Sequence, residues 1–234
     1  MSSEVDIQRQ YYAETAHRYD ELHLLEKDEH YFALAFLAAM IEFHNIQSIL
    51  DIGAGTGRTL LYLKQHCPRL RVVGIEPVEA LRKIAYEQGL SQSEMIDGDA
   101  LRLSYTAGEF DLVCEFGVLH HIRRPELAVA EMLRVAGKAI FISDSNNFGQ
   151  GSFAARAIKQ GINALGLWPV ADWFKTRGKG YTISEEDGLA YSYSVFNNFK
   201  QIEHVCKSVH ILNTRGGRIN PYRTADHIAL LGIK

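Results

Sequence analysis

The segment 48–57, SILDIGAGTG, constrains the fold of this chain more than any other. Its apolar first half predicts a buried strand that ends near Asp51, and a helix is predicted to follow the glycines. Glycines at Gly53, Gly55 and Gly57 permit positive φ angles and allow a ligand to approach the backbone closely. A turn of this kind after a central strand is where open α/β sheets bind nucleotides, although a turn without a ligand is the simpler alternative.

Short apolar runs alternate with helical stretches from residue 46 to residue 144. Each helical stretch has apolar residues three and four positions apart, and Pro125 lies where the first turn of a helix tolerates proline. This alternation indicates βαβ units and a parallel sheet. The predicted strands are 46–52, 70–76, 93–97, 110–116 and 138–144, and the predicted helices are 58–66, 79–89 and 125–137.

The regions on either side of this repeat follow other patterns. The first forty-five residues predict helices, whereas residues 145–180 are rich in Asn, Gly and aromatic residues and predict no clear strand. Alternating residues on both sides of Asp187-Gly188 predict a two-stranded hairpin. A helix over 194–208 and two final strands, 209–213 and 226–234, complete the prediction. These last two strands are expected to pair antiparallel at the edge of the sheet.

The spacing of the glycines distinguishes between two kinds of nucleotide cofactor. Dinucleotide sites favour G-x-G-x-x-G, but the position of the third glycine in that pattern is Arg58 here. The carboxylate of Asp51 is unfavourable beside a pyrophosphate and favourable beside an ammonium group. The loop therefore favours a nucleoside with an amino-acid tail and disfavours a dehydrogenase that binds NAD.

Two further carboxylates follow neighbouring predicted strands. Glu76 ends the second strand, where an acidic residue can accept hydrogen bonds from both ribose hydroxyls. Asp99 follows the third strand, where its carboxylate could accept the exocyclic amine of adenine. Each is an ordinary residue for the end of a strand when taken alone. Together with Asp51 they predict one ligand site at one edge of the sheet.

Four segments in this order, 48–57, 75–77, 98–100 and 110–122, resemble the class I S-adenosylmethionine-dependent methyltransferases. The resemblance is strongest to their small-molecule branch, which includes enzymes of quinone biosynthesis, and it covers residues 7–144 well and the last forty in outline. It implies an α/β fold with a three-layer, Rossmann-like, seven-stranded sheet of order 3-2-1-4-5-7-6, in which strand 7 is antiparallel. It also implies N-terminal helices and a lid insertion between strands 5 and 6.

The resemblance also implies S-adenosylmethionine as the cofactor and a set of residues that bind it. The methionine portion is assigned to Asp51 and the glycine backbone, the ribose to Glu76 and the adenine to Asp99. A backbone carbonyl of Glu115 or Phe116 is assigned to the amino group, and two N-terminal tyrosines cap the site. The full set is Tyr11, Tyr19, Asp51, Gly53, Ala54, Gly55, Gly57, Glu76, Pro77, Asp99, Ala100, Glu115 and Phe116. The usual proline-glycine-glycine turn before the fifth strand is replaced by RVAGKA.

The chemistry expected is in-line displacement of a methyl group from a sulfonium onto a small molecule, most simply at oxygen. Holding the two reactants in line supplies about 7–11 kcal/mol of barrier lowering. A hydroxyl acceptor also needs a general base, and the candidates are His120, His121 and Asp144. The alternatives are a packing role for the histidine pair and a capping role for the aspartate.

The insertion at about 145–194 is expected to hold the acceptor. Its aromatic residues predict either a flat, apolar acceptor pocket or a small core of the insertion itself. The residues concerned are Phe148, Phe153, Trp168, Trp173, Phe174, Tyr181, Tyr191 and Tyr193. Oxygen-bearing side chains that suit Mg²⁺ occur at Glu115, Asp144, Asn146 and Asn147, but their spacing does not match metal-dependent catechol methyltransferases, so no metal is predicted.

Composition restricts the remaining function classes. The 234 residues are 47% hydrophobic and carry a net charge of −3, which suits a single domain over 1–234 and disfavours a nucleic-acid partner. Three cysteines without a C-x-x-C pair, a polar start and apolar runs too short to span a bilayer favour a cytoplasmic protein. A methyltransferase acting on RNA or protein and a non-catalytic S-adenosylmethionine-binding protein stay as alternatives. The oligomeric state is not predicted.

Overall fold

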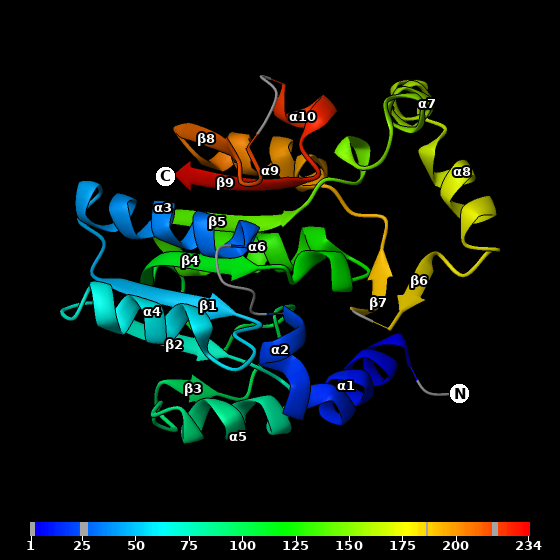
Figure 1. Cartoon of the computed structure of the whole chain (residues 1–234). Helices are drawn as coiled ribbons and strands as arrows, with labels where there is room; N and C mark the ends of the chain where they lie inside the picture. Colours follow the sequence, from blue (N-terminus) through cyan, green and yellow to red (C-terminus); the bar gives the residue numbers. More distant parts are fainter. Residues whose placement is uncertain (1–2, 24–27, 186, 217–219) are drawn as a thin grey trace.

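A seven-stranded sheet forms the centre of the molecule in a computed structural model that describes residues 3–23, 28–185, 187–216 and 220–234 (Figure 1). Its order is β3-β2-β1-β4-β5-β9-β8, with β1 to β5 parallel and β9 antiparallel to both β5 and β8. This confirms the predicted order, with β8 and β9 as the sixth and seventh strands. The strands are β1 Ser48–Ile52, β2 Arg71–Ile75, β3 Met95–Ile96, β4 Phe110–Phe116, β5 Ala136–Ser145, β8 Ser208–Asn213 and β9 His227–Ile233.

Helices cover both faces of this sheet and make the three predicted layers (Figure 1). On one face α6 packs on β4 and β5, and α9 packs on β8; on the other, α3 packs on β5 and α4 on β2. The N-terminal helices α1 and α2 lie at the carboxyl ends of the parallel strands. The helices are α1 Glu4–Thr15, α2 Tyr19–His23, α3 Glu29–Phe43, α4 Arg58–His66, α5 Glu79–Glu87, α6 Pro125–Val135, α7 Phe153–Ala164, α8 Trp168–Lys175, α9 Phe199–Val205 and α10 Pro221–Thr224.

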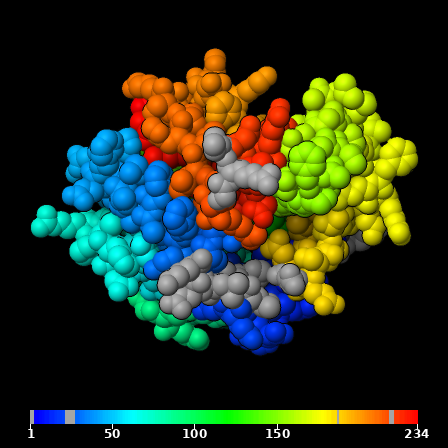
Figure 2. Space-filling model, turned by 45° about the horizontal axis from the view of Figure 1, so that its top comes forward, coloured from blue at the N-terminus to red at the C-terminus, as the bar shows by residue number. Residues whose placement is uncertain are grey.

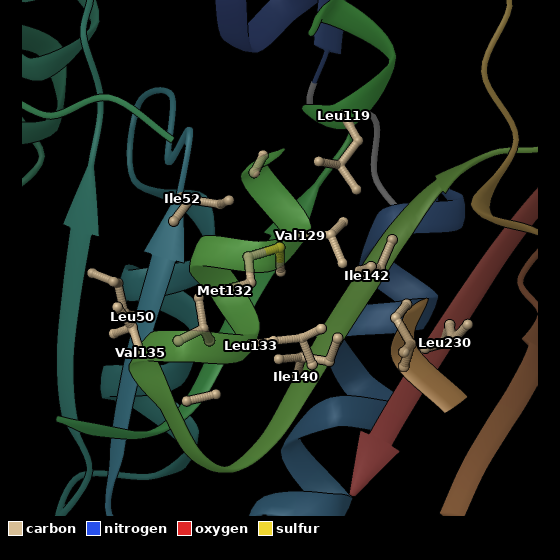
Figure 3. Close-up of a cluster of buried hydrophobic side chains, with 14 of the residues drawn as sticks. Leu50, Ile52, Leu119, Val129, Met132, Leu133, Val135, Ile140, Ile142 and Leu230 are labelled. Carbon is tan, nitrogen blue, oxygen red and sulfur yellow. The ribbon is translucent and has the colours of Figure 1, made fainter. Parts of the chain in front are cut away.

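The apolar runs of the sequence are the central strands because these strands are buried on both sides. Successive residues of β5 alternate between the two layers. Ile140 and Ile142 face the cluster under α6, whereas Ala139 and Phe141 belong to the cluster under α3 and α4. Figure 3 shows the first cluster, in which Met132 of α6 lies among apolar side chains of the sheet. This packing fixes the carboxyl ends of β1, β2, β4 and β5 relative to one another.

The insertion between β5 and β8 contains helices α7 and α8 and then a hairpin. Strands β6 Tyr181–Ser184 and β7 Gly188–Tyr191 pair antiparallel, which confirms the hairpin predicted on either side of Asp187-Gly188. The hairpin lies beside α1. The two helices replace the irregular segment expected over 145–180. Among the described residues, no helix is long and apolar enough to cross a membrane.

Candidate cofactor and acceptor site

A cavity of about 330 Å³ opens at the carboxyl ends of β1, β2 and β4, beneath α1. We call it the first cavity. Its wall combines apolar side chains with a few polar groups, as expected for a small-molecule site. Seven of the predicted cofactor-binding residues line it: Tyr19, Gly53, Glu76, Pro77, Asp99, Ala100 and Phe116. The other six, Tyr11, Asp51, Ala54, Gly55, Gly57 and Glu115, lie outside its lining.

The glycine loop is tightly packed against the residues around it. Gly53 and Gly55 have φ angles of +66° and +57°, which side chains rarely adopt. A Cβ on Gly53 would lie 2.5 Å from Cγ2 of Val118, and a Cβ on Gly55 would lie 2.7 Å from the hydroxyl oxygen of Tyr19. Only glycine fits either position, so the loop has the close backbone approach that a nucleoside cofactor requires.

Glu76 is a buried carboxylate at the end of β2 that faces the first cavity. Its two oxygens accept hydrogen bonds from the backbone N–H of Gly55 at 3.0 Å and of Val78 at 2.8 Å. Burial raises the pKa of Glu76 to about 7, although both hydrogen bonds favour the ionised form. The carboxylate is therefore held at a fixed place beside the loop, and its charge depends on pH near neutrality.

Two further predicted site residues, Asp51 and Glu115, have buried carboxylates. Asp51 is buried, with one carboxylate oxygen 3.5 Å from the Cys114 sulfur, and burial raises the pKa of Asp51 to about 7. Glu115 is fully buried and accepts the N–H of Val118 at 2.8 Å and of Ser143 at 3.1 Å. Burial and the nearby Asp144 raise the pKa of Glu115 well above its usual value. The assignment of Asp51 to the methionine portion, and of a backbone carbonyl of Glu115 or Phe116 to the amino group, stays a prediction.

The third predicted carboxylate has a different environment. Asp99 is exposed and lines the first cavity, and one of its oxygens accepts the backbone N–H of Leu101 at 2.9 Å. The hydrogen bond to Leu101 uses one of the two carboxylate oxygens of Asp99. The position is compatible with the predicted contact to an exocyclic amine.

Tyr12 lines the first cavity, whereas the predicted Tyr11 does not. The hydroxyl of Tyr12 lies 2.9 Å from Nε2 of His121, while the hydroxyl of Tyr11 donates to the carbonyl of Glu185 in the hairpin turn. Gln8, one helical turn before Tyr12, lines the same cavity.

His120 lies between two aspartates. Its Nδ1 is 2.7 Å from Oδ1 of Asp144 at the end of β5, and its Nε2 is 3.1 Å from Oδ2 of Asp187 in the hairpin. Burial alone would lower the pKa of His120, but the two carboxylates hold it well above its ordinary value. The same ion pair lowers the pKa of Asp144 to about 2 against the effect of burial. His120 is therefore an imidazolium that donates from both nitrogens.

The neighbouring His121 has a different hydrogen-bond pattern. Its Nδ1 is 2.7 Å from the carbonyl oxygen of Leu189, and a carbonyl only accepts, so Nδ1 carries a hydrogen. Its Nε2 faces the hydroxyl of Tyr12 at 2.9 Å and lies 3.4 Å from Oδ1 of Asp187. His121 lines the first cavity, with Nε2 as the nitrogen available to accept a proton.

A second cavity, of about 510 Å³, lies between the end of β5 and the hairpin. His120, Asp144 and Asp187 line it, and Tyr191 lines both cavities. Polar and charged side chains make up most of its wall. Of the eight aromatic residues predicted for an apolar pocket, only Tyr191 and Tyr193 line this one, while Phe148 is buried against Trp168 and Tyr222.

The oxygen-bearing residues considered for Mg²⁺ do not all reach this cavity. Asp144 and Asn147 line it, whereas Glu115 and Asn146 are buried outside the lining. The amide of Asn146 donates to the carbonyl of Ala225 at 2.8 Å and accepts from Ser194 at 2.8 Å. The hydrogen bonds of the Asn146 amide therefore join the insertion to the sheet.

Comparison with known proteins places the same segments in one family. Residues 50–140 match the model of a methyltransferase domain. Norajmaline N-methyltransferase of Rauvolfia serpentina is 37% identical over 94 residues, which cover 38% of this chain and 32% of that protein. Demethylmenaquinone methyltransferase of Deinococcus radiodurans is 33% identical over 96 residues, which cover 39% of each chain. The matched part thus spans less than two fifths of either relative.

Among solved structures, magnesium protoporphyrin IX methyltransferase of Synechocystis PCC 6803, with S-adenosylmethionine bound, superposes with a TM-score of 0.64. The superposition covers 100% of this chain and 98% of that one at 14% identity, and it shows that the two share a fold. The family match begins on β1 and runs through the glycine loop, Glu76 and the histidine pair to β5. Residues 50–140 therefore match a methyltransferase domain, which agrees with the predicted family, the class I S-adenosylmethionine-dependent methyltransferases, and with the predicted cofactor.

Proposed function

We propose that this protein transfers the methyl group of S-adenosylmethionine to an oxygen of a small, polar acceptor. The observation that carries the proposal is the adjacency of two cavities that share Tyr191. The first has the glycine loop and the carboxylate that a nucleoside cofactor needs, and the second has a polar wall. The cofactor supplies an electrophilic methyl group on its sulfonium, and the chain supplies position and proton removal.

Within this proposal the first cavity binds the cofactor. Glu76 accepts the ribose hydroxyls, and the backbone of Gly53 lies against the ligand. Asp99 and Ala100 contact the adenine, while Tyr12 and Tyr19 cover the ligand from the N-terminal side. All but Tyr12 were predicted, and all six line the cavity. The burial of Glu76 excludes water from the bonds that it makes, which strengthens them.

We assign general-base catalysis to His121 rather than to His120 or Asp144. His120 already holds two protons in its ion pairs with Asp144 and Asp187, so it has no lone pair to offer. In the neutral ring of His121 the hydrogen lies on Nδ1, which donates to the carbonyl of Leu189, so Nε2 carries the lone pair. Oδ1 of Asp187 lies 3.4 Å from Nε2. Because His121 lines the first cavity, an acceptor hydroxyl loses its proton there only when it reaches the boundary between the cavities beside Tyr191.

Titration calorimetry with S-adenosylhomocysteine tests the cofactor site. The Glu76→Ala variant should bind at least about 100-fold more weakly, because it loses two charge-assisted hydrogen bonds to the ribose. Glu79→Ala is the matched control, since Glu79 is at the exposed start of α5, where it pairs with Lys83. If the unaltered protein is folded and binds no S-adenosylhomocysteine, the proposal is wrong.

A further inference from the structure

Helix α7 presents its polar side to the protein. The ammonium of Lys159 donates to the carbonyl of Asn147, and the amide of Gln160 donates to the carbonyl of Phe148 at 2.9 Å. One turn later, Asn163 donates to the hydroxyl of Tyr222 at 3.0 Å. These hydrogen bonds attach the helix to the rest of the molecule, and no residue of α7 is buried.

The opposite side of α7 is apolar and faces outward. Ile158 on this side is 62% exposed, and Leu165, just past the end of the helix, is 75% exposed; Phe153 at the start of the helix is 76% exposed. An amphipathic helix of a globular protein normally has the reverse orientation, with its apolar side on the core. Packing within this chain does not explain why the apolar side of α7 faces outward. A partner that covers the apolar side would explain it.

The same exposed surface continues onto α8. Val170, Trp173 and Phe174 follow the i, i+3, i+4 spacing of one helix side, and no residue of α8 is buried. Fifteen large apolar residues are exposed in the described part of the chain, and seven of them lie between residues 153 and 174. We call these seven, each more than half exposed, the α7–α8 face: Phe153, Ile158, Leu165, Leu167, Val170, Trp173 and Phe174.

Positive charge accompanies this face. Residues 151–180 contain five lysines and arginines and a single acidic residue, Asp172, although the whole chain carries a net charge of −3. The turn after α8 brings two of these cations close to the aromatic residues. A Cβ on Gly178, between Arg177 and Lys179, would lie 3.3 Å from Nε1 of Trp173. An apolar side with Trp, Phe and Leu beside Lys and Arg is typical of helices that lie in a membrane interface.

We propose that the α7–α8 face binds the surface of a membrane that contains anionic lipids. The apolar side chains enter the interface while the cations contact the lipid headgroups. A second copy of this chain is a poorer partner, because the same basic segment would face itself across a two-fold contact. The two helices lie at one end of the molecule, away from the central sheet (Figure 1), and form a projecting edge in Figure 2. None of the seven apolar residues of this face lines either cavity.

Sedimentation of the full chain with vesicles tests this proposal. We expect binding to vesicles of phosphatidylglycerol and phosphatidylcholine, little binding to phosphatidylcholine alone, and weaker binding at high salt. Replacement of Phe153, Leu165 and Phe174 by serine should weaken binding more than about tenfold. Reversal of Arg177 or Lys179 to glutamate should weaken it about fivefold each. Phe43→Ser is the matched control, because Phe43 is 78% exposed at the end of α3.

Fluorescence gives a second measurement that does not depend on sedimentation. The chain has two tryptophans, so a Trp168→Phe background reports Trp173 alone. Its emission should shift to the blue on anionic vesicles and stay unchanged on neutral ones. Equal thermal unfolding of all variants shows that they are folded. The proposal is wrong if folded protein binds neither vesicle, or if the serine variant binds as well as the unaltered chain. It is also wrong if the serine substitutions abolish a dimer or a complex with an acidic protein while vesicle binding persists.

Discussion

Asp187 in the hairpin turn and His120 after β4 lie 3.1 Å apart, from Oδ2 to Nε2. The other nitrogen of His120 bonds Asp144 at the end of β5. One imidazolium thus connects the insertion to the carboxyl end of the sheet, over 67 residues of sequence. Because His120 and His121 line different cavities, this connection also forms part of the boundary between the two.

Asp187→Asn should loosen the hairpin. The neutral amide keeps the shape of the side chain but loses the ion pair with His120, and Asp187 is 40% exposed, so screening by water limits the effect to about 1 kcal/mol of the free energy of unfolding. We expect faster hydrogen exchange in β6 and β7 and a lower kcat/KM. Glu185→Gln removes a charge from the same turn without touching His120, and it should leave both quantities unchanged. An equal effect of the two variants would contradict this role.

The His120 ion pairs predict that stability declines at alkaline pH. Folding raises the pKa of His120 above its ordinary value of 6.5, so its contribution is complete below pH 6.5 and is lost as pH rises through the higher value of the folded state. Urea unfolding at a series of pH values above neutrality measures the decline. His120→Gln should be less stable than the unaltered protein at neutral pH and should show a flatter profile. A profile unaltered by this substitution would contradict the assignment.

The sheet could be predicted because its central strands are apolar on both sides. β4 and β5 show this directly, since Val113 and Ile140 pack under α6 while Cys114 and Phe141 pack toward α3. In a chain of this size, such apolar runs are stable only where both of their sides are buried, which is the centre of the sheet. The hairpin was predictable for a local reason, because Asp187-Gly188 favours a turn and Gly188 has a φ of +69°.

The acceptor side of the site was less predictable. The contact of His120 with Asp187 depends on how the hairpin folds back onto the sheet, and no pattern in either segment specifies it. The aromatic residues of the insertion predicted an apolar pocket or a small core, but Phe153 and Phe174 are 76% and 70% exposed. Tyr11 and Tyr12 are adjacent, and only the rotation of α1 decides which of them lines the first cavity.

Gly53→Ala should damage the loop more than a comparable substitution elsewhere. Gly53 and Gly89 both have a positive φ, so alanine costs about 1 kcal/mol of backbone strain at either position. A Cβ at Gly53 also collides with Val118, which adds about 1–3 kcal/mol, whereas nothing lies within 4 Å of a Cβ at Gly89. Thermal unfolding and calorimetry with S-adenosylhomocysteine should show a larger loss of stability and of affinity for Gly53→Ala. Equal losses in Gly53→Ala and Gly89→Ala would mean that backbone strain, and not the contact with Val118, determines the effect of alanine.

Tyr12→Phe tests the proton-accepting role of His121. The substitution removes the hydroxyl 2.9 Å from Nε2 and keeps the ring in the wall of the first cavity. We expect a change of up to about tenfold in kcat, since the Tyr12 hydroxyl orients the Nε2 atom of His121. Tyr11→Phe is the matched control, because the Tyr11 hydroxyl bonds the hairpin backbone instead. An identical kcat in both variants would remove the support for His121 as the base.

Cofactor affinity should rise with pH through neutrality. The pKa of Glu76 is about 7 because the carboxyl is buried, so below that value most molecules hold a neutral acid that cannot accept both ribose hydroxyls. Binding of S-adenosylhomocysteine should therefore weaken by up to about tenfold for each pH unit below 7 and level off above it. In the Glu76→Gln variant the affinity should be lower and should lose this dependence.

Asp51 titrates in the same range, since its pKa is also about 7, but it lies outside the lining of the first cavity. Asp51→Asn separates the two groups. If Asp51→Asn abolishes the pH dependence and Glu76→Gln keeps it, the charge of Asp51 determines the affinity for the cofactor. The assignment of the ribose to Glu76 is then wrong.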